Sequence, residues 1–106
     1  GRSSQAEKPL NKAIELNPSL SDAWFQRGEL YLDFNRIDEA ISDFKQAVKI
    51  TPHHIDARLR IAAILHEGNN PEKAIIAWRN ILDIDPQNRL ARRRIEECKQ
   101  TFNSKW

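Results

Sequence analysis

The sequence predicts an all-α fold built from antiparallel helix-turn-helix repeats, and three observations lead to this prediction. Pro18, Pro52 and Pro86 recur every 34 residues, a period typical of repeated helical hairpins. Between the prolines, apolar residues recur at spacings of three, four and seven, as expected of helices with one buried face. Asn35 and Asn69 stand at equivalent places within two successive periods, where each hairpin would turn.

The composition suits one domain with a small core, since 40% of the 106 residues are apolar and 30% are charged. The 17 Lys and Arg nearly balance the 15 Asp and Glu, so bulk charge favours neither nucleic acid nor a membrane surface. No apolar run approaches the roughly 20 residues of a membrane span. A single cysteine excludes an internal disulfide and favours the cytoplasm or another intracellular compartment. Because the chain has no methionine, we expect it to be part of a longer protein.

The predicted elements follow one another without long gaps. We predict a leader at 1–5, the second helix of a partial repeat at 6–18, full repeats at 21–54 and 55–88, a capping helix at 89–103 and a tail at 104–106. The leader is expected to be flexible or a remnant of cloning. Because proline is tolerated only in the first turn of a helix, the first helix is expected to begin near Pro9. In the first full repeat, helices are predicted over 22–34 and 38–50.

The predicted turns carry residues with suitable chemistry. Asn35 and Asn69 tolerate the left-handed conformation that ends many helices. Asp38 places a carboxylate near the start of the next helix, and Asn70 followed by Pro71 matches a cap and a first-turn proline. Both ends of the hairpin turns are therefore encoded locally.

The order of large and small residues resembles the tetratricopeptide repeat family, whose pattern contains Trp, Leu, Gly, Tyr, Ala, Phe, Ala and Pro at set positions. The first full repeat matches seven of these eight, with Trp24, Gly28, Tyr31, Ala40, Phe44, Ala47 and Pro52. Arg27 replaces the expected Leu. We predict that its aliphatic stem covers the edge of the core while its guanidinium group stays in water.

The second repeat is a looser copy of the first. Arg58 replaces the Trp and Ile81 replaces a small Ala, for which Leu65, smaller than the usual Tyr, is expected to make room. In the capping helix, Glu96 and Lys99 occupy positions that are small and aromatic in the family. The apolar residues of that helix, Ala91, Ile95, Cys98 and Phe102, are predicted to form one stripe.

The resemblance implies a short right-handed superhelix with a concave side lined by the first helix of each repeat. It places a partner-binding groove at positions that interleave with the packing residues: Asp22, Phe25, Gln26, Glu29, Leu32, Asp33, Asp56, Leu59, Arg60, Ala63, His66, Glu67, Leu90, Arg93 and Arg94. Such a groove would be acidic at one end and basic at the other. Phe25, Leu59 and Leu90 would supply apolar contacts, which favours an extended or helical peptide as ligand.

One branch of the family grips the C-terminal carboxylate of a chaperone with Lys, Asn and Arg at five groove positions. This chain has Phe25, Glu29, Arg60, Leu90 and Arg94 at those places, and only Arg94 agrees. Glu29 would also repel a carboxylate, so the comparison argues against this ligand. Arg60 and Arg94 are left as candidates for holding a different anion.

Other chemistries find less support in the sequence. His53, His54 and His66 lack the spacing of metal ligands and are expected to be solvated. Cys98 lies on the apolar stripe of the last helix and is expected to be a buried packing thiol rather than a nucleophile. The arginines of 89–94 have no aromatic stacking platform beside them, which argues against nucleic-acid binding.

We therefore expect a protein-interaction module without enzymatic activity, cofactor or metal, serving as an adaptor segment of a larger protein. Two alternatives remain open. The first is self-assembly through the terminal repeat faces, because Leu10 and its neighbours belong to a half-repeat without its own first helix. The second is binding of RNA or phosphate by the basic capping helix.

Overall fold

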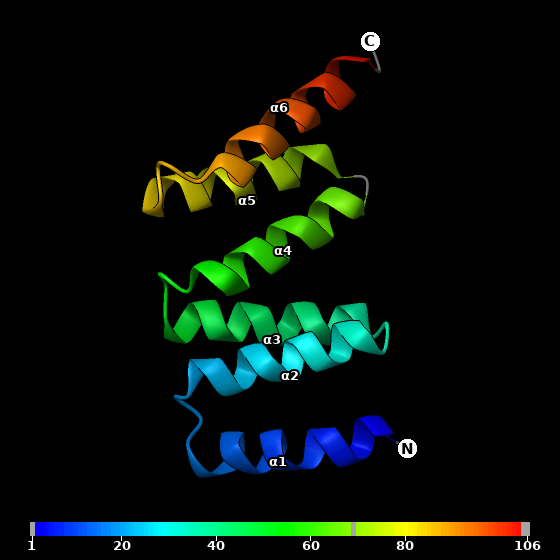
Figure 1. Cartoon of the computed structure of the whole chain (residues 1–106), viewed down its shortest axis with the longest axis vertical. Coiled ribbons are helices and arrows are strands. Elements are labelled where there is room, and N and C mark those ends of the chain that lie inside the picture. The colour runs from blue at the N-terminus through cyan, green and yellow to red at the C-terminus, as the bar shows by residue number, and fades with distance from the viewer. Residues whose placement is uncertain (1, 69, 105–106) are drawn as a thin grey trace. The chain divides into compact units, whose positions relative to one another are not determined.

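The computed structural model describes the backbone of residues 2–68 and 70–104 and the side chains of 5–68 and 70–100. These residues form six α-helices and no strands, which confirms the predicted all-α helical-repeat fold (Figure 1). The helices are α1 (Arg2–Leu16), α2 (Ser21–Asp33), α3 (Ile37–Ile50), α4 (Ile55–Glu67), α5 (Pro71–Ile84) and α6 (Arg89–Ser104). The chain divides into two compact units, residues 1–57 and 58–106.

In the first unit, α2 and α3 form an antiparallel hairpin (Figure 1), and a glycine lies where the two helices meet. Gly28 is buried in α2, and a Cβ atom added to it would lie 2.7 Å from Cε1 of Phe44 on α3. Phe44 is itself fully buried. The absence of a side chain at Gly28 therefore lets the two helices approach closely.

The turn between α2 and α3 has the conformation that the sequence predicted for Asn35. Its φ angle is 59°, in the left-handed region that asparagine tolerates. The backbone N–H of Asn35 donates to the carbonyl of Leu32 at 2.9 Å, and that of Arg36 donates to Tyr31 at 2.8 Å. These two bonds satisfy carbonyls at the end of α2 in a Schellman motif.

Arg27 differs from its sequence-based prediction. Its Nε and one terminal nitrogen donate to the two carboxylate oxygens of Asp43 at 2.8 Å, and the other terminal nitrogen donates to Asn11 at 2.9 Å. The Arg27 side chain is 19% exposed and that of Asp43 only 4%. The prediction of a solvated guanidinium was wrong, because Asp43 on α3 supplies a buried charge that holds it.

The start of α1 also differs from prediction. The helix begins at Arg2, ahead of both the expected start at Ala6 and Pro9, so Pro9 lies inside it. Glu7 accounts for part of this difference, since it forms an ion pair with Arg36 at 3.2 Å and a hydrogen bond with Tyr31. These contacts hold the turn before the proline against α2 and the start of α3, which offsets the backbone hydrogen bond that proline removes.

The second unit is organised around one core cluster contributed by α4, α5 and α6. Its buried members are Ala62, Ala74, Trp78, Ile81, Ala91, Ile95 and Cys98. Ile81, which replaces the small residue of the family pattern, is fully buried, and Leu65 packs against the same cluster. Both residues therefore contribute to the same core.

The ends of the helices in this unit follow the expected chemistry where they are described. The Asn70 side chain accepts the backbone N–H of Lys73 at 3.4 Å, and Pro71 occupies the first turn of α5, as a cap and its following proline should. At the C-terminus, α6 ends at Ser104, one residue into the predicted tail. Asn69, Trp106 and the side chain of Phe102 lie outside the described residues.

Candidate partner-binding site

The predicted groove residues of the first unit lie on α2 and at the start of α4, where they differ in exposure. Exposed residues are Asp22, Gln26, Asp33 and Asp56, and half-buried residues are Phe25, Glu29 and Leu32. The exposed members are three carboxylates and one amide. This unit therefore offers a partner mainly hydrogen-bond acceptors with negative charge.

Phe25 has a second function that the sequence did not reveal. Its ring centroid lies 5.6 Å from that of Phe44 and 5.0 Å from that of His54, with interplanar angles of 47° and 40°. Such tilted contacts are typical of packed aromatic groups. Phe25 therefore packs against the core and has only part of its ring available to a partner.

His54 is a structural residue and not a solvated one, so that expectation was wrong. Its side chain is 11% exposed, and its Nδ1 accepts the backbone N–H of Ala57 at 3.2 Å, which caps the start of α4. Because Nδ1 is an acceptor, the proton of the neutral ring resides on Nε2. Nε2 lies 3.2 Å from the carboxylate of Asp22, so His54 also orients one predicted groove residue.

In the second unit, four predicted groove residues line one hollow. The hollow has a volume of about 170 Å³ and is lined by Ala63, His66, Glu67, Trp78 and Arg94. Of the other predicted residues in this unit, Arg60, Leu90 and Arg93 are exposed, whereas Leu59 is half-buried against the core. The geometry thus gathers the predicted residues from α4 and α6 around the indole of Trp78. Trp78 occupies a core position in the repeat pattern, so the sequence did not predict that it would line this hollow.

His66 connects this hollow to the buried cysteine. Its Nδ1 lies 3.2 Å from Sγ of Cys98, and its Nε2 lies 3.6 Å from a carboxylate oxygen of Glu97. Its ring also meets Trp78 edge-on, at 6.3 Å between centroids. The expectation of a solvated histidine was therefore wrong for His66 as well, because side chains of α5 and α6 contact its ring.

The chemistry of this cluster favours a protonated thiol over a nucleophile. Cys98 is 3% exposed, and burial, with a smaller effect of the Glu97 charge, raises the pKa of its thiol. This agrees with the predicted packing cysteine. No group of three or more His, Cys, Asp and Glu side chains suited to a metal ion occurs among the described residues.

Glu97 controls how much positive charge the hollow presents. Arg94 donates to it at 2.8 Å, and Arg93 lies 3.4 Å from its other oxygen. The hydrogen bond from Arg94 is the main reason that the pKa of Glu97 is lowered. A partner's anion at Arg94 would have to compete with this carboxylate. Arg93 is more accessible, with a side chain 77% exposed.

Helices of this arrangement stack into helical-repeat proteins, a class that uses extended surfaces of its repeats for binding. The chain belongs to the tetratricopeptide repeat family, because two models described as tetratricopeptide repeat match residues 31–93 and 10–42. Within the described residues, no helix has both the length and the apolar character of a membrane span.

Comparison with individual proteins agrees with this membership. A segment of 48 residues is 40% identical to neutrophil cytosol factor 2 of Bos taurus, and the match covers 45% of this chain and 9% of that protein. MamA superposes with a TM-score of 0.85 at 19% identity, over 97% of this chain and 60% of MamA. The first TPR of Spaghetti (RPAP3), bound to the HSP90 peptide SRMEEVD, superposes with a TM-score of 0.81 at 20% identity, over 97% and 84% of the two chains. The two superpositions establish the fold alone.

Proposed function

We propose that the chain is a protein-interaction module that binds a peptide or protein partner through exposed side chains of α2, α4 and α6. In this proposal it is an adaptor segment of a larger protein and performs no catalysis itself. The observation that carries the proposal is the hollow of the second unit, where Ala63, His66, Glu67 and Arg94 surround Trp78. A concave surface on which a few polar groups converge is a typical feature of binding sites.

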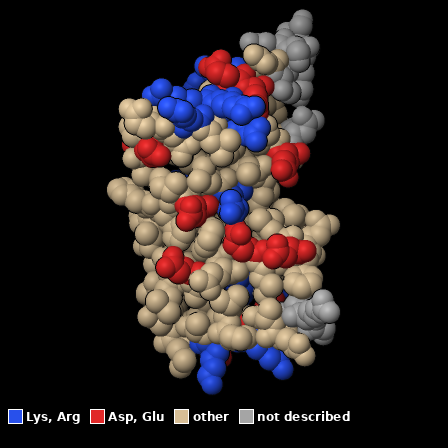
Figure 2. Space-filling model, in the orientation of Figure 1, with Lys and Arg blue, Asp and Glu red and all other residues tan. Residues whose placement is uncertain are grey.

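The charges of the two units suggest the chemistry of the partner. The first unit presents the carboxylates of Asp22, Asp33 and Asp56 on its exposed positions, whereas Arg60 and Arg93 are exposed in the second. Figure 2 shows basic side chains gathered over the start of α6. A partner with cationic side chains would match the first unit, and a partner with carboxylates would match the second.

A peptide ending in a free carboxylate is not the ligand that we propose. One structural relative holds an HSP90 peptide, but this chain has Phe25 and Leu90 at two positions where that mode of binding needs cations. Phe25 is also engaged with Phe44 and His54. Of the five groove positions used in that mode of binding, only the one at Arg94 has the required residue. Arg94 already donates a hydrogen bond to Glu97.

A peptide selected from a displayed random library on the wild-type chain provides a direct test. Arg94→Gln removes a charge at the wall of the hollow and is expected to weaken binding about tenfold. Arg89→Gln is the matched control, because Arg89 is exposed on the same helix and does not line the hollow. Far-ultraviolet circular dichroism should be the same for all three proteins.

The two variants distinguish binding at the hollow from attraction by net charge. Equal binding by the wild type and the Arg94→Gln variant would contradict the proposed site. Equal loss in both variants would show that net charge alone attracts the peptide, and would also count against the hollow.

A further inference from the structure

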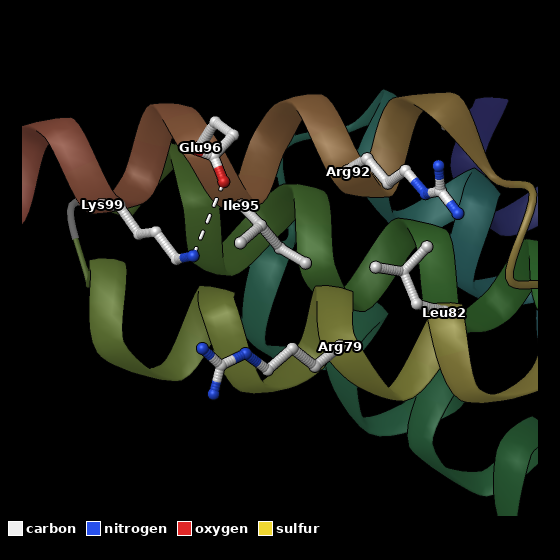
Figure 3. A pocket seen from close by; sticks show the side chains of 6 residues that line it. All are labelled: Arg79, Leu82, Arg92, Ile95, Glu96 and Lys99. Carbon is white, nitrogen blue, oxygen red and sulfur yellow. Dashed lines mark ion pairs between the residues drawn. The ribbon is translucent and has the colours of Figure 1, made fainter.

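A second and larger hollow lies between α5 and α6, on side chains that the proposed partner site does not use (Figure 3). Its volume is about 470 Å³, and its lining residues are Arg79, Leu82, Arg92, Ile95, Glu96 and Lys99. All six belong to the second unit and to helices that pack against each other. We call this hollow the α5–α6 groove.

The floor of the α5–α6 groove is apolar and firmly packed. Leu82 and Ile95 point into the space between the two helices (Figure 3). Ile95 is buried in the core cluster and Leu82 packs against it, so neither has to be reordered when a partner binds. One turn before Arg79, Ile76 is 59% exposed, which extends the apolar surface of α5.

The rim of the groove is basic. Arg79, Arg92 and Lys99 contribute three positive charges and Glu96 contributes one negative charge, a net of +2. Lys99 lies 3.5 Å from Glu96, and Arg92 donates to the carbonyl of Pro86 at 2.8 Å. Among the described residues, the side chain of Arg79 has no hydrogen bond or ion pair. The uncompensated charge is therefore spread along both helices.

Glu96 and Lys99 also distinguish this groove from an ordinary repeat. In the tetratricopeptide pattern the corresponding positions of a first helix are small and aromatic, which suits close packing of an apolar second helix. Here both side chains are charged and exposed. A helix that lies on α5 and α6 must therefore bring carboxylates to the rim as well as apolar side chains to the floor.

We propose that the α5–α6 groove is a second binding surface, and that its occupant is an acidic amphipathic helix of a partner protein. The apolar face of that helix contacts Leu82 and Ile95. Carboxylates on both sides of this face pair with Arg79, Arg92 and Lys99. Laying an amphipathic helix in a groove is an established mode of recognition. The positive charge of the rim favours a helix with negative charge.

A displayed library of helical peptides provides the probe. Each peptide carries a fixed leucine stripe at positions i, i+4 and i+7 with randomised flanks, and selection uses the wild-type chain. We expect Asp and Glu to be enriched in the flanks. The selected peptide should bind the Arg79→Glu/Arg92→Glu variant at least about tenfold more weakly, and its affinity for the wild type should fall as salt is raised.

Two control variants locate the site. Lys73→Glu makes the same type of charge reversal at an exposed position of α5 outside the groove and should leave binding unchanged. Arg94→Gln alters the hollow between α4 and α6 and should also leave it unchanged, so failure of this proposal is distinguishable from failure of the proposed function.

Several outcomes would overturn the proposal. They are a selection that yields no acidic helix, binding that survives reversal of Arg79 and Arg92, and binding that is lost only in Arg94→Gln. Self-association of the wild type that disappears in the double variant would assign the groove to a second copy of the chain. Binding of single-stranded RNA that disappears in that variant would assign it to nucleic acid.

Discussion

Arg27 and Asp43 replace apolar packing with a charged contact at one position of the repeat. The equivalent residues of the second repeat, 34 positions later, are Ile61 and Ala77. The same chain therefore contains a charged and an apolar solution to one packing problem. In the first unit, the Arg27 guanidinium also lies 5.0 Å from the Trp24 ring centroid and is held by Asn11. Because several groups surround this ion pair, either partner left alone would be costly to bury.

Replacing Arg27 by isoleucine should expose this cost. The Arg27→Ile variant leaves the Asp43 carboxylate buried without its guanidinium, and we expect a loss of about 3–5 kcal/mol in the free energy of unfolding. The double variant Arg27→Ile/Asp43→Ala copies the second repeat and should recover most of that loss. Urea unfolding followed by circular dichroism measures both, and a double variant no more stable than the single one would contradict the argument.

Gly28 provides a second test at the residue scale. Alanine favours a helix by about 1 kcal/mol over glycine, yet its Cβ would lie 2.7 Å from the Phe44 ring. We expect Gly28→Ala to destabilise the fold by about 1–3 kcal/mol, because overpacking outweighs helix propensity. Adding Phe44→Leu should restore part of the lost stability. An increase in the urea midpoint of the single variant would show that the helices move apart at little cost.

At the scale of elements, α1 is joined to the first hairpin by Glu7 as well as by apolar contacts. Glu7 pairs with Arg36, which also binds Glu39 at the start of α3. Arg36 lies over the Tyr31 ring, 4.4 Å from its centroid. Burial and then the hydrogen bond with Glu7 raise the pKa of Tyr31 to about 12. The titration of one phenol therefore reports how α1 docks.

The pH dependence follows from this shift. Since the native pKa of about 12 lies above the ordinary value near 10, folding retains a proton that the unfolded chain loses. This contribution to stability is complete below about pH 10 and disappears as the pH rises toward about 12. Tyr31 is the only tyrosine, so ultraviolet absorbance of the phenolate gives its titration directly.

Glu7→Gln should lower the pKa of Tyr31, because it removes a negative charge beside the phenol while keeping a similar shape. Glu15→Gln, at an exposed position of the same helix, is the control and should leave the titration unchanged. A native titration near pH 10 in the wild type would show that α1 does not enclose the phenol.

At the scale of the whole molecule, each unit has buried groups of its own. Phe44 and its alanine neighbours are buried in the first unit, whereas Trp78, Ile81 and Cys98 are buried in the second. The cysteine is a natural probe of the second core, because its thiol has to become exposed before it reacts with a reagent.

We expect native Cys98 to react with a disulfide reagent about 100-fold or more slowly than the urea-unfolded chain at the same pH. Ile81→Ala removes buried volume from the same cluster and should accelerate the native reaction. The replacement Ile76→Ala, on the exposed side of α5, should not. Similar rates for the native and unfolded wild type would mean that the thiol is not enclosed.

The helices could be predicted because their signals are local and repeated. The prolines, the asparagine turns and the apolar spacing each constrain a few neighbouring residues, and the 34-residue period links them. The contacts of Glu7 on α1 could not be predicted in the same way, because Tyr31 and Arg36 lie far from it in the sequence. The contacts of His54 and His66 were missed for the same reason, since their partners include Asp22 on α2 and Cys98 on α6.

By itself, the sequence determined the helical hairpins, their order and the residues that pack at the repeat positions. Helical periodicity and turn chemistry are short-range properties, so they can be recognised without coordinates. Only the tertiary structure decided which polar side chains meet: Arg27 with Asp43, His66 with Cys98, and the basic rim between α5 and α6. These contacts depend on how side chains from different helices are oriented toward one another, and residue spacing along one helix does not specify that orientation.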